Sequence, residues 1–159
     1  MNTWDVKTKE RISTTFFACV AAAAVWFTVG QNTYVAWLPC IFFSALFIIS
    51  VTREVLVTVG DVTIGMSTIS ATISGAAVVF YTLNSPLAYV IAIATTVVYP
   101  RNIRDKKWAI LTFNVSNDLI AGCAVYGVLH LLNFSIYESL PLVIAKVFVA
   151  AFTYEIVNY

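Results

Sequence analysis

Six stretches of apolar residues, separated by short polar segments, run along this chain of 159 residues. An α-helix needs ~20 residues to cross the ~30 Å hydrocarbon core of a bilayer, and several of the stretches fall short of that length. The pattern predicts an all-α integral membrane protein, a compact bundle of six transmembrane helices. The predicted spans are residues 12–29, 33–51, 67–83, 86–99, 108–132 and 140–157.

The stretch before the third span has a different pattern. Residues 55–64 are β-branched on both sides of Gly60 and Asp61, a two-residue turn signal, so a short β-hairpin is predicted here. An early start of the third helix is the alternative. The length of the chain predicts one domain, residues 1–159.

The basic residues indicate the orientation of the bundle. Eight of the nine Lys and Arg residues lie near the start of the chain, after the second span or after the fourth, and the segments between the other spans have none. Basic loops remain in the cytoplasm under the positive-inside rule. The rule predicts both termini in the cytoplasm, and it leaves one cation, Lys146, inside the sixth span.

The composition of the chain limits the classes of function that it can have. The chain is 60% hydrophobic and 11% charged with a net charge of +1, which indicates a lipid environment and argues against a nucleic-acid partner. Cys19, Cys40 and Cys123 are scattered without metal-ligand spacing, so we expect buried thiols and neither a metal nor a cofactor. The motifs of zinc proteases, serine hydrolases and P-loop enzymes are missing from the sequence, so an enzyme is not expected.

Polar residues inside the fifth span are the candidate site. Asn114, Asn117 and Asp118 are spaced i, i+3, i+4 and share one helical face. Counted from the cytoplasmic ends of their helices, Asp118 and Lys146 both lie roughly 15 Å deep at 1.5 Å per residue. We therefore predict an Asp118–Lys146 ion pair near the membrane midplane. Ionisable groups at this depth are candidates for a ligand or proton site, and a role confined to helix packing is the alternative.

Small residues on the first span are the candidate docking surface. Ala18 and Ala22 lie at four-residue spacing, an interval that lets helix backbones approach closely. Packing within the chain is the more common use of such a stripe. His130 and Glu138 flank the loop after the fifth span and could form half of a metal or pH-sensing site, although a lone histidine at a helix end is usually only solvated.

Residues 54–132 resemble the membrane-embedded sensory region of bacterial HD-GYP-type signalling proteins. The similarity is carried by Gly60-Asp61, Ser85-Pro86, the basic loop 101–107 and Phe113-Asn114. It implies an intramembrane module in the bacterial cytoplasmic membrane that senses a cue and acts through a cytoplasmic effector. This sequence contains no effector domain, so the effector is expected in a longer chain or a separate partner.

A second resemblance is to the S components of ECF-type vitamin transporters, which also have six spans and dock a membrane subunit through small residues on the first span. Ala18 and Ala22 fit that pattern. We expect a sensory or ligand-binding module that acts through a protein partner. A transporter S component and a structural subunit of a larger membrane complex are the alternatives.

Overall fold

The computed structural model describes residues 3–52, 55–59, 62–66, 69–97 and 103–158. Within these residues the chain forms six α-helices, one 3₁₀ turn and two strands. The elements are α1 (Thr3–Val29), α2 (Trp37–Thr52), β1 (Val55–Val59), β2 (Val62–Met66), α3 (Ile69–Thr82), α4 (Pro86–Ala94), η1 (Thr95–Val97), α6 (Trp108–Leu131) and α7 (Leu140–Asn158).

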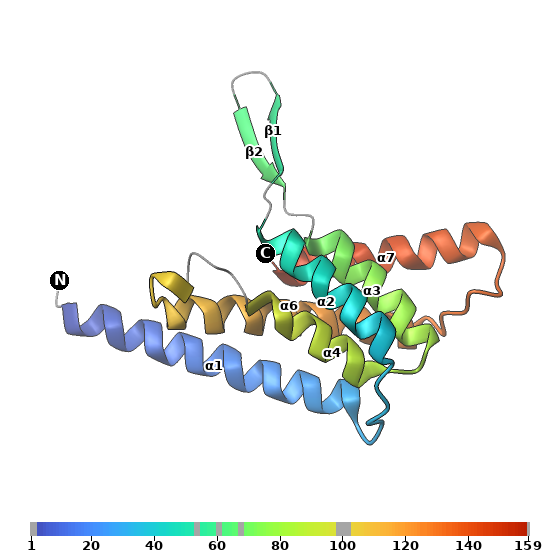
Figure 1. Cartoon of the computed structure of the whole chain (residues 1–159), viewed down its shortest axis with the longest axis horizontal. Coiled ribbons are helices and arrows are strands. Elements are labelled where there is room, and N and C mark those ends of the chain that lie inside the picture. Colours follow the sequence, from blue (N-terminus) through green and yellow to red (C-terminus); the bar gives the residue numbers. More distant parts are fainter. Residues whose placement is uncertain (1–2, 53–54, 60–61, 67–68, 98–102, 159) are drawn as a thin grey trace.

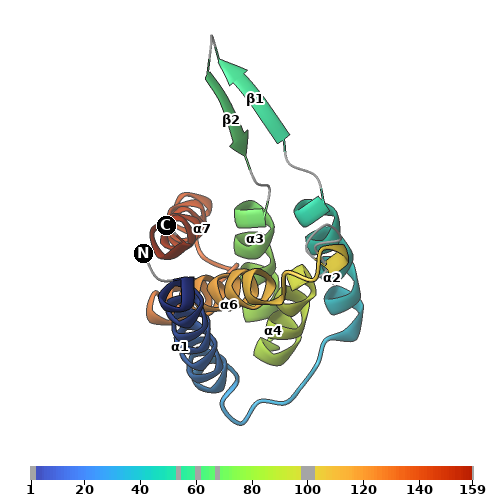
Figure 2. The same ribbon diagram turned by 90° about the vertical axis from the view of Figure 1, so that its left-hand side faces the viewer.

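The helices run back and forth, and α6 lies at the centre of the bundle. Helices α1, α3, α4 and α7 contact α6, and α2 packs on the outer side of α3 and α4 (Figures 1 and 2). The segments 30–36, 83–85 and 132–139 meet at one end of the bundle, which we call the loop end. The two termini and the β-hairpin lie toward the other end (Figure 1).

The core forms where the short helices meet α6. Phe47, Phe80, Tyr89, Ile93 and Val125 are among its fully buried side chains. Small residues allow the close approach, because apolar attraction between helices is weak in lipid. At Gly122 an added Cβ would overlap the Ile93 side chain. The Tyr89 hydroxyl faces the backbone oxygens of Ile73 at 3.3 Å and Gly122 at 3.2 Å, which ties α4 to α3 and α6.

Three residues in the left-handed backbone region reverse the chain at the loop end. They are Gly30 (φ 53°), Asn84 (φ 49°) and Asn133 (φ 46°). Gly and Asn tolerate this conformation better than other residues, which is why they follow helix C-termini. Pro86 then begins α4, where its missing N–H leaves no helical bond unmade.

The segment predicted to form a hairpin contains two antiparallel strands. Val55 is paired with Met66 and Val59 with Val62, and α3 begins only at Ile69. The predicted turn residues Gly60 and Asp61 lie outside the described residues.

Among the described residues, three helices are long and apolar enough to cross a membrane: Thr8–Val29, Trp108–Leu131 and Leu140–Asn158. The helices within the other three predicted spans are shorter. At 1.5 Å per residue, the 16 residues of α2 and the 14 of α3 extend about 24 Å and 21 Å. Length and composition therefore support a membrane protein with three candidate spans rather than six.

Candidate functional site

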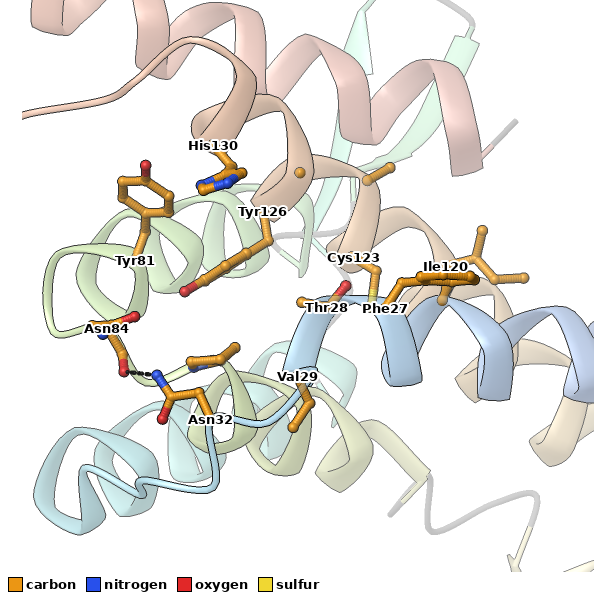
Figure 3. Close-up of a pocket in the computed structure, with 14 residues that line it drawn as sticks. Phe27, Thr28, Val29, Asn32, Tyr81, Asn84, Ile120, Cys123, Tyr126 and His130 are labelled. Carbon is orange, nitrogen blue, oxygen red and sulfur yellow. Dashed lines mark hydrogen bonds between the residues drawn. The ribbon is translucent and has the colours of Figure 1, made fainter.

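The clearest candidate for a binding site is a cleft of about 770 Å³ at the loop end. We call it the loop-end cavity. It lies between α1, the end of α3, the start of α4 and α6, and Figure 3 shows its lining. Small-molecule sites are typically concave spaces of roughly 300–1,000 Å³ with a few polar groups among apolar ones. The lining residues are Ala24, Phe27, Thr28, Val29, Asn32, Tyr81, Asn84, Pro86, Ile120, Cys123, Ala124, Tyr126, Gly127 and His130.

Hydrogen bonds from the turn between α3 and α4 hold one wall of this cavity. The Ser85 hydroxyl, which is fully buried, donates to the Tyr34 carbonyl at 2.9 Å and accepts from the Ala36 amide at 3.0 Å. Nearby, the Asn32 side chain donates to the Asn84 carbonyl at 2.8 Å (Figure 3). Segment 30–36 is therefore fastened to the α3–α4 turn.

Aromatic rings form the wall on the α3 and α6 side. The Tyr81 ring lies edge-on to Tyr126, with centroids 5.4 Å apart, and also contacts the His130 ring at 6.2 Å. Tyr126 stacks on the buried ring of Tyr89 at 5.7 Å. Tyr126, Gly127 and His130 follow one another within little more than a turn of α6, which is why one helix supplies so much of this wall.

The predicted Asp118–Lys146 ion pair is wrong. The Lys146 ammonium donates instead to Glu138 at 2.7 Å and to the Asn133 carbonyl at 3.3 Å. Lys146 lies six residues after the start of α7, so its long side chain reaches back to the loop end. The pair is mostly buried, with side-chain exposures of 15% for Lys146 and 22% for Glu138. Each charge therefore neutralises the other inside the protein.

Asp118 lies nearer the opposite end of α6. Its carboxylate accepts a hydrogen bond from the Tyr154 hydroxyl at 3.0 Å. Tyr154 is eight residues beyond Lys146, so the two levels on α7 are about 12 Å apart. An Asp118–Lys146 pair would require α6 and α7 to end at the same level. In the structure α7 is shifted along α6 by about two turns.

The four polar residues predicted as one site are thus not brought together. Asn117 donates to the side chain of Asn158, while Asn114 is exposed on the surface of α6. Asn117 and Asp118 both bond to the end of α7, an arrangement that fits the packing role considered for them. None of the four lines the loop-end cavity.

The candidate docking residues lie on a largely uncovered helix. Ala21 is buried against the bundle, Ala18 is half-buried and Ala22 is exposed. The α1 surface that contacts neither α6 nor α4 is therefore open to lipid or to another subunit. Cys40 and Cys123 are buried as expected, but Cys19 is exposed on α1.

Sequence reasoning missed the loop-end cavity because its lining comes from separate helices and turns. Single polar residues such as Asn32 and Asn84 resemble ordinary turn residues in the sequence, and Tyr81 resembles an interfacial aromatic. One signal was available: Tyr126 and His130 lie four residues apart on one helical face with Gly127 beside them.

No protein-family model matches this chain, and comparisons with known proteins and with solved structures found no match.

Proposed function

We propose that this protein is a six-span membrane module that binds a small molecule in the loop-end cavity and transmits its presence to a partner protein. The observation that carries the proposal is the cavity itself. A cleft of about 770 Å³ with an aromatic wall and amide groups has the size and composition of a small-molecule site. A purely structural subunit would need no such space.

The positive-inside rule supports an orientation with this cavity on the outside. All described Lys and Arg residues except Lys146, which pairs with Glu138, belong to the start of α1 or the segment before α6: Lys7, Lys9, Arg11, Arg104, Lys106 and Lys107. Both segments lie at the end of the bundle opposite the loop end (Figure 1). Basic segments stay on the cytoplasmic side, so a ligand would reach the cavity from outside the cell.

Helix length alone supports three spans, and we propose that the three shorter helices also cross the membrane. Helix α4 is short, but most of its residues, including Ala88, Tyr89 and Ile93, are buried by neighbouring helices. A helix shielded in this way need not match the bilayer thickness by itself, and the bilayer can thin locally around short spans.

Cysteine labelling distinguishes three spans from six. Single cysteines replace Gln31, Lys106 and Ile136 in a variant without native cysteines, and a membrane-impermeant maleimide is added to intact cells. Six spans place positions 31 and 136 outside and 106 inside. Three spans, formed by α1, α6 and α7, would place 31 and 106 on the same side and 136 on the other, which would contradict the proposed topology.

A partner is proposed because the module needs an output. Its docking surface is assigned to the exposed side of α1 that includes Ala22, where a small side chain permits close helix contact. Two kinds of partner fit: a cytoplasmic signalling effector, as in HD-GYP-type proteins, or the membrane subunit of an ECF-type transporter. The externally facing cavity favours neither, so ligand uptake into sealed vesicles and effector activation are the assays that separate them.

Ligand binding can be tested without knowing the ligand. Gly127 lines the cavity, and a Cβ added there meets nothing within 4 Å. Gly127→Leu should therefore fill the cavity without distorting the helix. Gly75 on α3 has equally open surroundings, but it does not line the cavity, so Gly75→Leu is the matched control.

Native mass spectrometry of the protein released from nanodiscs is the readout. After incubation with a bacterial metabolite extract, the wild type and Gly75→Leu should carry the same small-molecule adduct, and Gly127→Leu should have lost it. An adduct retained by Gly127→Leu, or no adduct on any form, would contradict binding in this cavity.

A further inference from the structure

The chemistry of the cavity wall also indicates what kind of molecule fits there. Tyr126 extends into the loop-end cavity from α6 (Figure 3). One face of its ring lies against Tyr89, at 5.7 Å between centroids and 29° between ring planes. Tyr89 is fully buried and does not line the cavity. The face of Tyr126 turned away from Tyr89 is therefore the one that can meet a ligand.

The Tyr126 ring is held in place on two sides. Tyr89 supports its covered face, and the Tyr81 ring meets it edge-on at 5.4 Å with an interplanar angle of 62°. Tyr81 is itself packed against Phe134 and His130. A supported ring offers a rigid flat surface at little cost in conformational entropy, and flat aromatic ligands pack on such a surface in offset-stacked geometry.

The polar groups around this surface are mostly uncharged amides and hydroxyls. Asn32 and Asn84 lie across the cavity from Tyr126 (Figure 3). Asn84 is exposed, and among the described residues its side-chain amide has no hydrogen-bond partner. The amide is therefore available to a ligand, to which it can donate and from which it can accept. A ligand edge with an adjacent N–H and C=O matches this pair of capacities.

Charge argues against an ionic ligand. The 14 lining residues include no Lys, Arg, Asp or Glu. Lys146 and Glu138, which also lie at the loop end, neutralise each other at 2.7 Å. An ion entering the cavity would lose water without gaining a counter-ion, which is costly.

We infer that the ligand of the loop-end cavity is a flat, uncharged heteroaromatic ring whose edge carries an amide-like N–H and C=O, and that it stacks on Tyr126. This inference rests on the proposed function and names the ligand class. An organic cation held by the tyrosine rings is the main competitor, because cations also bind aromatic faces.

Three probes of similar size separate these chemistries. Quinolin-2-one is flat, uncharged and carries a lactam edge. Decahydroquinolin-2-one keeps the lactam but has no aromatic ring, and N-methylquinolinium keeps the aromatic rings but is a cation without the lactam. Each is titrated against the protein in nanodiscs by saturation-transfer NMR, with empty nanodiscs subtracted to remove partitioning into lipid.

Quinolin-2-one should bind at least tenfold more tightly than either other probe. Its binding should be lost in Gly127→Leu and kept in Gly75→Leu. Tyr126→Leu should weaken it about tenfold, whereas Tyr126→Phe, which retains the ring, should stay within about threefold of the wild type.

The outcomes distinguish the ligand class from the proposed function. Tighter or equal binding of the saturated lactam or the cation, sensitive to Gly127→Leu, would overturn the ligand class while leaving the cavity a binding site. Failure of all three probes to bind would overturn the ligand class. The metabolite adduct on wild type and Gly75→Leu would then decide the proposed function separately. Absence of that adduct would overturn the ligand class and the proposed function together.

Discussion

Helix α6 lies so close to α4 at Gly122 that a larger side chain at this position should destabilise the protein. In Gly122→Ala the new Cβ overlaps Ile93 Cδ1 and comes within 3.1 Å of the Tyr89 hydroxyl. That hydroxyl is positioned by the backbone oxygens of Ile73 and Gly122 itself, so it has little freedom to move.

Two effects of opposite sign act on this variant. Overpacking a close-packed core costs typically 1–3 kcal/mol, and replacing Gly by Ala within a helix returns about 1 kcal/mol. Gly127→Ala on the same helix gains the second effect without the first, because its Cβ has open space. We expect Gly122→Ala to be less stable than Gly127→Ala by about 2 kcal/mol.

Ile93→Val provides the internal check, because valine lacks the Cδ1 atom that the new methyl would overlap. By itself it should cost about 0.5–1.5 kcal/mol. In the double variant with Gly122→Ala the overlap is relieved. The loss of stability in the double variant should therefore be smaller than the sum of the two single losses by about 1 kcal/mol.

The free energy of unfolding is measured by reversible titration from mild detergent into sodium dodecyl sulfate, followed by circular dichroism. Equal stabilities of the two alanine variants, together with additive effects of Gly122→Ala and Ile93→Val, would refute the close packing of α4 on α6.

Three further predictions concern hydrogen bonds and charges, each measured by the same unfolding titration. Lys146→Met and Glu138→Gln should each cost about 2–3 kcal/mol, because each leaves a mostly buried charge unpaired, and the double variant should recover at least 1 kcal/mol; additive costs would argue against the pair. The stability losses of Asp118→Asn and Tyr154→Phe should be coupled by roughly 1 kcal/mol. Those of Asp118→Asn and Lys146→Met should simply add. Coupling of Asp118→Asn to Lys146→Met instead of to Tyr154→Phe would support the midplane ion pair. Ser85→Ala should cost about 1–3 kcal/mol because the buried Ala36 amide loses its acceptor, and an unchanged stability would show that segment 30–36 is not fastened there.

The positions of the helices could be predicted because each helix depends mainly on the apolar residues of its own segment. The apolar stretches predicted most helix ends to within a few residues, and Pro86 marked the start of α4. Two ends were missed by more: α1 begins at Thr3, nine residues before its predicted start, and α4 ends at Ala94, five residues before its predicted end. Helix α2 begins at Trp37, so Pro39 lies in its first turn, where its missing N–H disturbs no helical bond.

The relation between helices could not be predicted in the same way. Asp118 and Lys146 are at similar distances from their helix ends, but the contact between Asp118 and Tyr154 shows that α7 is shifted along α6. Such a shift depends on how the side chains of two helices pack together, so it cannot be predicted from the sequence of either helix alone. The loop-end cavity has the same origin, since residues such as Asn32, Tyr81 and Tyr126 become neighbours only after four helices have packed.

A fluorine label at Tyr126 reports whether a ligand occupies the loop-end cavity. The protein carries 3-fluorotyrosine at this position in nanodiscs, and its ¹⁹F spectrum is recorded with and without metabolite extract. We predict that the Tyr126 resonance shifts on addition of extract in the Gly75→Leu background and stays unchanged in Gly127→Leu. A resonance that is unmoved in both, while a small molecule is bound to the protein in the mass spectrum, would place the ligand elsewhere and contradict the account.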